Sequence, residues 1–153
     1  CTITESTTIA DILKGIEEYP VDTVVITGGE PLMWKLEKLT SSLKERGLKV
    51  HLETSGAYSY SGDFDWVCLS PKKMQAPLTE IKPLISELKV IVNNKHDFVW
   101  AQEQREGLSA DCKLYLQAEW SKRETVIPMI IDFIKENKEW TISLQSHKYM
   151  NIP

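Results

Sequence analysis

The chain alternates short apolar runs with longer segments in which apolar residues recur every three or four positions. Short runs rich in Val, Ile and Leu and bounded by turn residues are typical of strands buried in a sheet. Strands that alternate with helices or loops are typical of a parallel sheet or partial barrel. We therefore expect one α/β domain over residues 1–153, with about six strands, at residues 23–27, 49–52, 65–69, 88–92, 113–116 and 140–144.

The segments between these strands carry helix signals. Thr8 and Asp11 form a potential capping box ahead of the apolar face of a first helix. A second amphipathic helix is expected to end near Gly47. The other signals are Asn94 and Asp97 before a third helix, Gly107 after it, a second potential capping box of Ser121 with Glu124, a bend at Pro128, and a short helical connection between Pro77 and Pro83.

Composition excludes several classes of protein. The formal net charge is -4, whereas proteins that bind duplex nucleic acid are normally basic. No apolar run approaches the roughly 18–20 residues of a membrane span. The cysteines at positions 1, 68 and 112 are too scattered for a disulfide framework or a metal motif. We therefore expect a protein of the reducing cytoplasm, without a nucleic-acid or membrane partner.

Polar or glycine residues follow one predicted strand after another. In a parallel barrel the carboxyl ends of the strands meet at one face, which is where active sites are built. The sequence therefore predicts a binding site at that face, formed by Thr27-Gly28-Gly29-Glu30, Glu53-Thr54, Ser70-Pro71-Lys72, Gln117-Ala118-Glu119 and Gln145-Ser146-His147.

Each of these groups has a ligand-binding and a structural interpretation. The amides at Gly28 and Gly29 can approach a ligand closely, and Glu30 can hold an ammonium, but such turns are also plain connections. A Lys72 buried at a strand end suggests an anionic partner, although this turn can also be solvated. The same choice between ligand binding and a structural role applies to Glu53 and Thr54, which can cap a turn, to Gln117, whose amide can be satisfied internally, and to His147, which can be a structural hydrogen bonder. Trp120 can flank a ligand. Cys68 and Cys112 are expected to be small buried hydrophobes, and no role is assigned to His51 and His96.

Six motifs together identify a family that the chain resembles. The first is Thr27-Gly28-Gly29-Glu30-Pro31, which is similar to the motif with which radical S-adenosylmethionine enzymes hold the methionine amino group. The others narrow the resemblance to the 7-carboxy-7-deazaguanine synthases: Leu52-Glu53-Thr54-Ser55-Gly56, Leu69-Ser70-Pro71-Lys72, Glu87-Leu88-Lys89-Val90, Leu116-Gln117-Ala118-Glu119-Trp120 and Ser143-Leu144-Gln145-Ser146-His147-Lys148. The resemblance runs from about residue 22 to residue 153.

The resemblance implies a fold and a reaction. The fold is an open, partial (β/α) barrel of the radical S-adenosylmethionine type. The family converts 6-carboxy-5,6,7,8-tetrahydropterin into 7-carboxy-7-deazaguanine with release of ammonia, in the queuosine and deazapurine pathway. A [4Fe–4S] cluster cleaves S-adenosylmethionine to a 5′-deoxyadenosyl radical, which takes a hydrogen atom from the pterin, and Mg²⁺ assists. The implied partners are the pterin, a reductase such as flavodoxin or ferredoxin, and a second copy in a homodimer.

The resemblance also implies roles for individual residues. Those expected to bind S-adenosylmethionine are Gly28, Gly29, Glu30, Ser70, Pro71, Lys72, Gln117, Ala118 and Glu119. Those expected to bind or lie near the pterin are Thr27, Glu53, Thr54, Gln145, His147 and Pro153, whose terminal carboxylate can accept two N–H donors.

The chain departs from the family in two places. Ala118 stands where relatives often have proline. The three cysteines that hold the cluster are absent; only Cys1 can belong to their loop, and a cluster needs several thiolates. Since the chain begins with Cys1 rather than Met, we expect a missing upstream segment that contains the first βα unit. The alternatives are a non-catalytic domain that binds S-adenosylmethionine or a pterin, and another radical S-adenosylmethionine activase.

Overall fold

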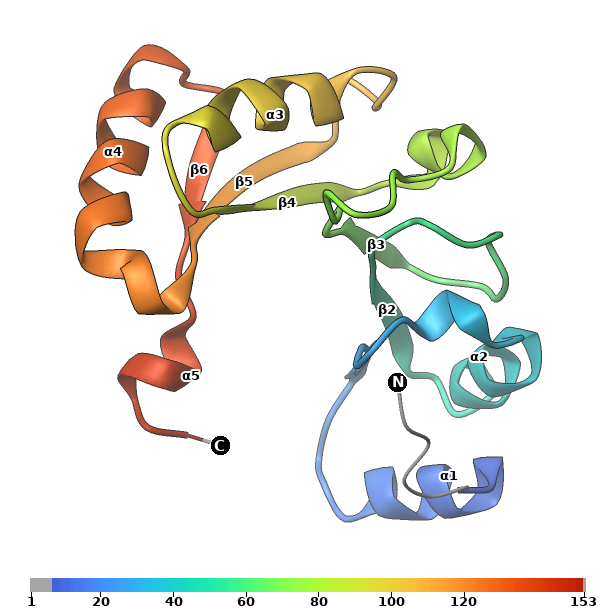
Figure 1. The fold of residues 1–153 in the computed structure, drawn as a ribbon. Coiled ribbons are helices and arrows are strands. Elements are labelled where there is room, and N and C mark those ends of the chain that lie inside the picture. Colours follow the sequence, from blue (N-terminus) through green and yellow to red (C-terminus); the bar gives the residue numbers. More distant parts are fainter. Residues whose placement is uncertain (1–6, 153) are drawn as a thin grey trace.

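A computed structural model describes residues 7–152 and shows six parallel strands in one curved sheet, with helices on its outer side (Figure 1). Each strand pairs only with its neighbours in sequence, so the order is β1-β2-β3-β4-β5-β6 and β1 and β6 form the two edges. The open parallel α/β sheet expected from the sequence is therefore confirmed. Its strands are β1 (Thr23–Ile26), β2 (Lys49–Thr54), β3 (Trp66–Leu69), β4 (Glu87–Val92), β5 (Lys113–Ala118) and β6 (Trp140–Ser143).

Helical segments connect successive strands and cover the convex side of the sheet (Figure 1). The predicted Thr8–Asp11 capping box is present at the start of α1, and Gly47 follows α2 with a φ of 76°. No helix among these residues is long and apolar enough to cross a membrane. The helices are α1 (Ile9–Glu17), η1 (Pro31–Met33), α2 (Glu37–Lys44), η2 (Thr79–Leu84), α3 (His96–Arg105), η3 (Trp120–Lys122), α4 (Arg123–Glu136) and α5 (Ser146–Tyr149).

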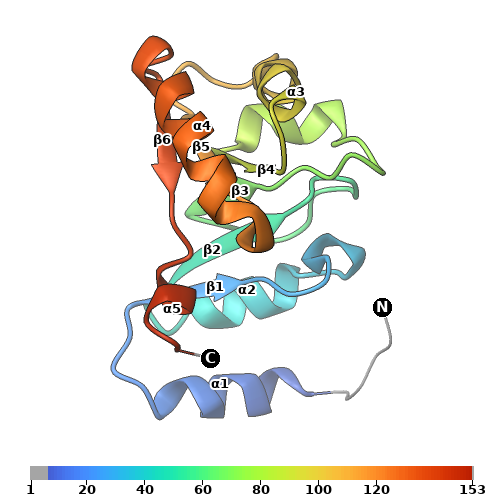
Figure 2. The same cartoon turned by 60° about the vertical axis from the view of Figure 1, so that its left-hand side comes forward.

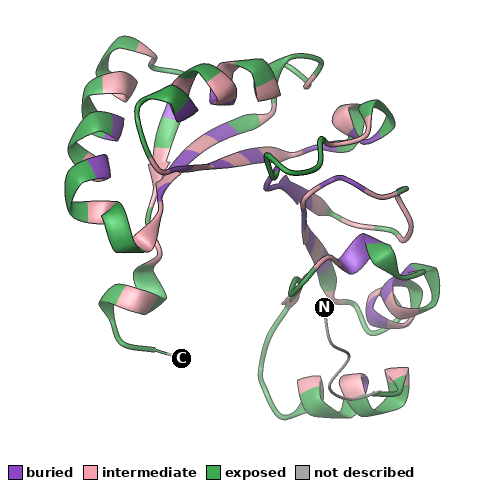
Figure 3. Cartoon of the chain, in the orientation of Figure 1, coloured by how far each residue is buried: buried purple, intermediate pink, exposed green. Residues whose placement is uncertain are grey.

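The two faces of the sheet differ in burial. Along β2, β4 and β5 every second residue is buried, because alternate side chains point to opposite faces of a strand (Figure 3). The buried set packs under the outer helices and forms the main core, with Leu52, Leu88 and Leu116 almost fully enclosed. The alternate set, which includes Glu53, Lys89 and Gln117, lies on the opposite, inner face of the sheet. This inner face carries most of the polar strand residues.

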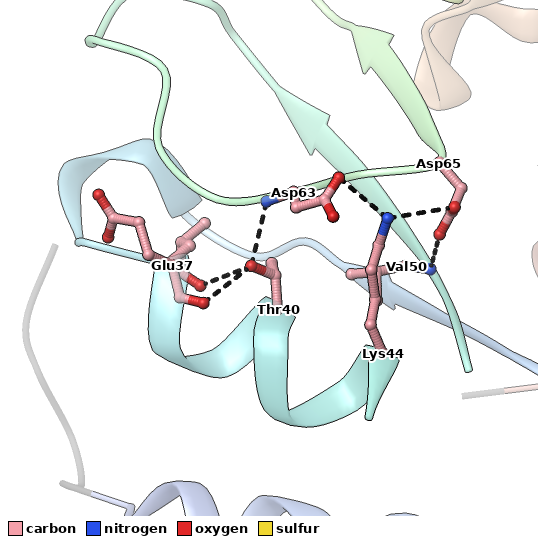
Figure 4. Close-up of polar contacts among 7 residues, drawn as sticks. Glu37, Thr40, Lys44, Val50, Asp63 and Asp65 are labelled. Carbon is pink, nitrogen blue, oxygen red and sulfur yellow. Dashed lines mark hydrogen bonds and ion pairs between the residues drawn. The ribbon is translucent and has the colours of Figure 1, made fainter. Parts of the chain in front are cut away.

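Polar contacts also tie the outer layer together between α2, β2 and the loop before β3 (Figure 4). Lys44 Nζ lies 2.9 Å from Asp63 Oδ1 and 3.3 Å from Asp65 Oδ1. Asp65 Oδ2 in turn accepts a hydrogen bond from Val50 N at 2.7 Å. Thr40, which is fully buried, donates to the Leu36 carbonyl and accepts from Asp63 N. We call this group, Thr40, Lys44, Asp63 and Asp65, the outer network.

Two expectations about local structure are wrong. Strands β2 and β5 run two residues further than predicted, so Glu53, Thr54, Gln117 and Ala118 end the strands rather than follow them. The Ser121–Glu124 capping box does not form, because the Glu119 carboxylate already accepts the Ser121 amide at 3.2 Å. The tail after β6, for which no structure was predicted from the sequence, contains the short helix α5, at the carboxyl end of the sheet (Figure 2).

Candidate functional site

The turn after β1 presents exposed backbone at the carboxyl edge of the sheet. Thr27, Gly28 and Gly29 are all exposed, and Gly28 has a φ of 121°, which L side chains rarely adopt. A Cβ added at Gly28 would meet nothing within 4 Å, so the space beside this glycine is open. The turn therefore offers its amides to a ligand without crowding from neighbouring side chains.

Glu30 fixes this turn to the end of β2. Its Oε1 accepts hydrogen bonds from Leu32 N at 3.1 Å and from Thr54 Oγ1 at 2.5 Å. Its Oε2 accepts from Ser55 N at 2.7 Å and from the Ser55 hydroxyl. Since two carboxylate oxygens offer about four lone-pair sites, this carboxylate is fully engaged within the protein. A ligand ammonium at Glu30, as the sequence predicts, would have to share these oxygens with internal donors.

A cavity of about 270 Å³ opens at the carboxyl ends of β1, β2 and β3. It brings together most of the predicted residues from the first half of the chain and adds three that the sequence did not single out, Ser55, Tyr58 and Gln75. Its lining consists of Thr27, Gly28, Gly29, Glu30, Glu53, Thr54, Ser55, Tyr58, Ser70, Lys72 and Gln75. We call it the rim cavity.

The Ser-Pro-Lys segment after β3 forms one wall of the rim cavity. Ser70 is buried, and its amide donates to the Thr54 carbonyl at 2.7 Å. Pro71 is buried beside it. Lys72 is exposed and its Nζ donates to Ser70 Oγ at 3.2 Å, so of the two alternatives left open by the sequence the structure has the solvated turn. The exposed ammonium remains available at the mouth of the cavity.

The second half of the chain contributes a separate, shallow hollow of about 10 Å³ between β5, β6 and α5. Gln117 and Ala118 line it together with Gln145, as do Trp120 and Tyr149. Gln117 Oε1 accepts from Ser143 Oγ at 3.2 Å, which leaves its amide nitrogen as a donor. These residues lie at the same edge of the parallel sheet as the rim cavity.

The remaining predicted residues fall outside both hollows. Hydrogen bonds from the Ser121 side chain and amide lower the pKa of Glu119, whose carboxylate caps the turn at η3. His147 is exposed on α5, and its carbonyl accepts from Ile152 N at 2.9 Å. Pro153 lies outside the described residues.

Trp120 packs against side chains of α5. Tyr149 meets its ring edge-on, with the centroids 5.0 Å apart. Lys148 Nζ lies 5.2 Å and the Arg123 guanidinium carbon 4.4 Å from its ring centroid. After α5, Asn151 adopts a left-handed φ of 53°, and Ile152 N bonds back to the His147 carbonyl, which is the Schellman way to end a helix. The last turn of the described chain is therefore held in a defined direction.

Lys89 is the inner-face residue that sequence reasoning missed. Its Nζ lies 2.8 Å from Glu53 Oε1, and its side chain is only 17% exposed. The signal was present in the sequence, because Lys89 stands between Leu88 and Val90, whose burial on the outer face leaves Lys89 facing inward. Its partner could not be inferred, since Glu53 belongs to a strand two positions away in the sheet.

The described cysteines do not suit an iron–sulfur cluster. Cys68 is buried on β3, and desolvation raises the pKa of its thiol far above the usual range. Burial also raises the pKa of Cys112. Between residues 7 and 152 there is no group of three His, Cys, Asp or Glu side chains that could hold a metal ion. Cys68 is therefore the small buried group that the sequence suggests, whereas Cys112 is only partly buried.

A larger hollow of about 440 Å³ lies elsewhere, at the amino-terminal ends of β5 and β6. Its charged lining residues include Arg105 and Glu139, which already pair with each other at 2.8 Å. In parallel α/β folds ligands bind at the carboxyl ends of the strands. The smaller rim cavity is therefore the better candidate site.

Comparisons with known proteins identify relatives of the chain. The sequence is 52% identical over 142 residues to a 7-carboxy-7-deazaguanine synthase of Flavobacterium psychrophilum, a match that covers 93% of this chain and 67% of that protein. It is 44% identical over 145 residues to a protein of the same name from Synechocystis, covering 95% of the chain and 69% of the relative. No protein-family model matches the sequence.

A solved structure shares the fold. The crystal structure of QueE from Escherichia coli superimposes with a TM-score of 0.81 and 27% sequence identity. The match covers 91% of this chain and 64% of the chain of that structure. The chain thus spans about two thirds of the length of the proteins that it matches.

Proposed function

Since the chain belongs to the 7-carboxy-7-deazaguanine synthase family, we propose that it forms the cofactor- and substrate-binding part of a radical S-adenosylmethionine lyase. The enzyme would convert 6-carboxy-5,6,7,8-tetrahydropterin into 7-carboxy-7-deazaguanine with release of ammonia. One observation carries the proposal at the level of the site. The Gly28–Gly29 turn, Glu53 and Ser70 converge on the rim cavity, at the carboxyl ends of three adjacent parallel strands.

The rim cavity fits a ligand with a zwitterionic amino-acid end, such as S-adenosylmethionine. The exposed amides of the glycine turn can donate to its carboxylate, while its ammonium is attracted by the negative charge of Glu30, whose oxygens it would share with the internal donors. Lys72 at the mouth and Ser70 in the wall add a cation and a hydroxyl. Gln117, Ala118 and Glu119 would lie toward the rest of the cofactor. When bound beside its cluster, S-adenosylmethionine supplies the radical that takes a hydrogen atom from the substrate.

Glu53 can accept hydrogen bonds from the pterin. Among the carboxylates that line the rim cavity, Glu30 is engaged by four internal donors, whereas Glu53 uses Oε1 for Lys89. Its Oε2 can therefore accept from the N–H donors of the guanidine-like edge of a pterin, and Thr27 can add a hydroxyl contact. Thr54 would serve by holding Glu30, while Gln145 and His147, and the carboxylate of Pro153, would approach the pterin from the side of α5.

The proposal requires cluster thiolates from outside residues 7–152, because Cys68 and Cys112 do not suit a cluster. In this proposal residues 1–153 belong to a single radical S-adenosylmethionine barrel, whose first βα unit supplies the cluster thiolates. Mg²⁺, a flavodoxin or ferredoxin reductant, a homodimer and a cytoplasmic location belong to the same proposal and rest on the family resemblance.

The test is anaerobic turnover by the complete protein after reconstitution with iron and sulfide. With S-adenosylmethionine, a reductant and 6-carboxytetrahydropterin, we expect 7-carboxy-7-deazaguanine and ammonia, detected by mass spectrometry and an ammonia assay. Calorimetric titration with each ligand should be run alongside. Binding of both ligands without product, from a protein that carries a full cluster, would contradict the proposed reaction.

A further inference from the structure

An ion pair crosses the centre of the inner face. Lys89 starts from the middle of β4 and reaches Glu53 on β2, so the contact spans the intervening strand β3. Two strand spacings amount to about 10 Å, which only a long side chain can bridge. The residue that pairs with Glu53 in β3 is Cys68, whose small side chain leaves room for the lysine to pass above it.

The surroundings keep Lys89 charged. Burial lowers the pKa of Lys89, but the hydrogen bond to Glu53 and the nearby acidic groups raise it by more, so that it lies above the ordinary value of 10.5. The neighbouring carboxylate of Glu87 is occupied by Trp66, whose Nε1 donates to Glu87 Oε2 at 2.9 Å. Glu53 is thus the carboxylate that Lys89 contacts directly.

The two partners of this pair differ in what they can reach. Glu53 lines the rim cavity, whereas Lys89 is not among the residues that line it. A partly buried ion pair contributes little net stability, because desolvation of both charges offsets their attraction. Packing alone therefore gives little reason for a lysine in the middle of a sheet face. Lys89 thus reaches Glu53 from β4 without lining the cavity itself, which points to control of the carboxylate.

We propose that Lys89 is a positioning residue: it fixes Glu53 through Oε1 so that Oε2 faces the N–H donors of the pterin. This inference rests on the proposed function, since it takes Glu53 as a substrate contact. Lys89 itself does not touch the substrate. Substitution of Lys89 must therefore weaken pterin binding and leave cofactor binding unchanged. The same substitution must have no effect on pterin binding once the Glu53 carboxylate has been removed.

A double-mutant cycle tests this proposal in the complete protein. The variants are Lys89→Met, which keeps the length of the side chain but removes its charge, Glu53→Gln, and both together. Pterin binding is measured by calorimetry with the stable analogue 6-carboxypterin, and the KM values for pterin and S-adenosylmethionine by turnover. Lys44→Met removes an ion-paired lysine from the outer network and is the matched control.

Lys89→Met is expected to weaken pterin binding about tenfold to a hundredfold, the scale of one charge-assisted hydrogen bond, with the KM for S-adenosylmethionine unchanged. In the Glu53→Gln background the same substitution should change pterin binding less than twofold. An undiminished loss in that background, or an equal rise in both KM values, would overturn the proposal. If Lys89→Met does not fold, Lys89→Arg, which alters reach while keeping the charge, takes its place in the cycle with the same criteria. Pterin binding without turnover by the unaltered protein would contradict the proposed reaction while leaving this cycle readable.

Discussion

Lys44 and Lys89 each form an ion pair with carboxylate side chains, Lys44 on the outer side of the sheet with two and Lys89 on the inner face with one. Lys44 joins Asp63 and Asp65, which belong to the loop before β3, and Asp65 and Thr40 make further hydrogen bonds to backbone groups (Figure 4). Lys89 joins Glu53 across a strand and leaves one oxygen of that carboxylate for a ligand. Similar chemistry thus ties a helix to an exposed loop on one side and holds a carboxylate that lines the rim cavity on the other.

This difference separates what holds the fold from what serves the site. The outer carboxylates are exposed and lie beside a helix and a loop that are near in sequence, so they add local stability that salt can screen. The inner pair is shielded and lies beside a cavity. Substitutions on the outer side should therefore change unfolding, and substitutions on the inner face should change ligand binding. The predictions below challenge that division.

The largest expected effect is a loss of stability on substitution of Gly56, which lies two residues after the end of β2. A Cβ at Gly56 would lie 2.6 Å from Leu69 Cδ1 and 3.2 Å from Pro77 Cβ, and the φ there is 74°. Gly56→Ala should lower the free energy of unfolding by about 3 kcal/mol, measured in urea. Gly47→Ala is the matched control, because Gly47 has a similar φ of 76° but nothing within 4 Å. Equal losses in the two variants would show that crowding at Gly56 is unimportant.

A smaller loss is expected at Asp97, a buried carboxylate of the outer side. It accepts from Asn93 N at 2.6 Å and Asn94 N at 3.2 Å and pairs with Lys73. Asp97→Asn should cost about 2 kcal/mol of stability at pH 7 and leave the pterin KM unchanged. A changed pterin KM with an unchanged unfolding curve would contradict the division between the faces.

The pH dependence of stability should report the same carboxylate. Burial raises the pKa of Asp97, but Lys73 and the two amides lower it by more, so the folded pKa lies below the ordinary value of 3.8. A carboxylate with a depressed folded pKa contributes stability that is present above its unfolded pKa and is lost as the pH falls through the folded pKa. The difference in unfolding free energy between the native protein and Asp97→Asn should therefore shrink below pH 3.8. A constant difference down to pH 2 would rule this out.

The smallest effect on overall stability is expected at Trp120, which holds α5 against η3. Trp120→Ala removes the contacts with Tyr149 and Lys148, each worth about 0.5–1.5 kcal/mol. Amide exchange in residues 144–152 should become faster while the midpoint of unfolding moves little. Trp120→Phe keeps a ring and should restore most of the protection. Unchanged exchange in the alanine variant would mean that other contacts hold α5.

The sequence was informative where structure depends on neighbours along the chain. The strands followed from apolar runs, and the capping box at Thr8 from two residues three apart. The same reasoning failed at Ser121, where Glu119 competes for the amide that a capping box would use. It also missed the Lys89–Glu53 pair and the three donors from Thr54 and Ser55 to Glu30, because those contacts join segments far apart in sequence. The edge of the sheet that carries the candidate site was predictable from the ends of the strands, but the hydrogen-bond and ion-pair partners of each carboxylate were not.

The most direct test of the division between the two faces is the pterin KM of Glu53→Gln compared with that of Lys44→Met, in the complete and reconstituted protein. Glu53→Gln removes the inner carboxylate, and its KM for 6-carboxytetrahydropterin should rise about tenfold to a hundredfold while the KM for S-adenosylmethionine stays constant. Lys44→Met should leave both KM values within about twofold, because its partners lie outside the rim cavity. An unchanged pterin KM in Glu53→Gln, or an equal rise in both variants, would contradict the account.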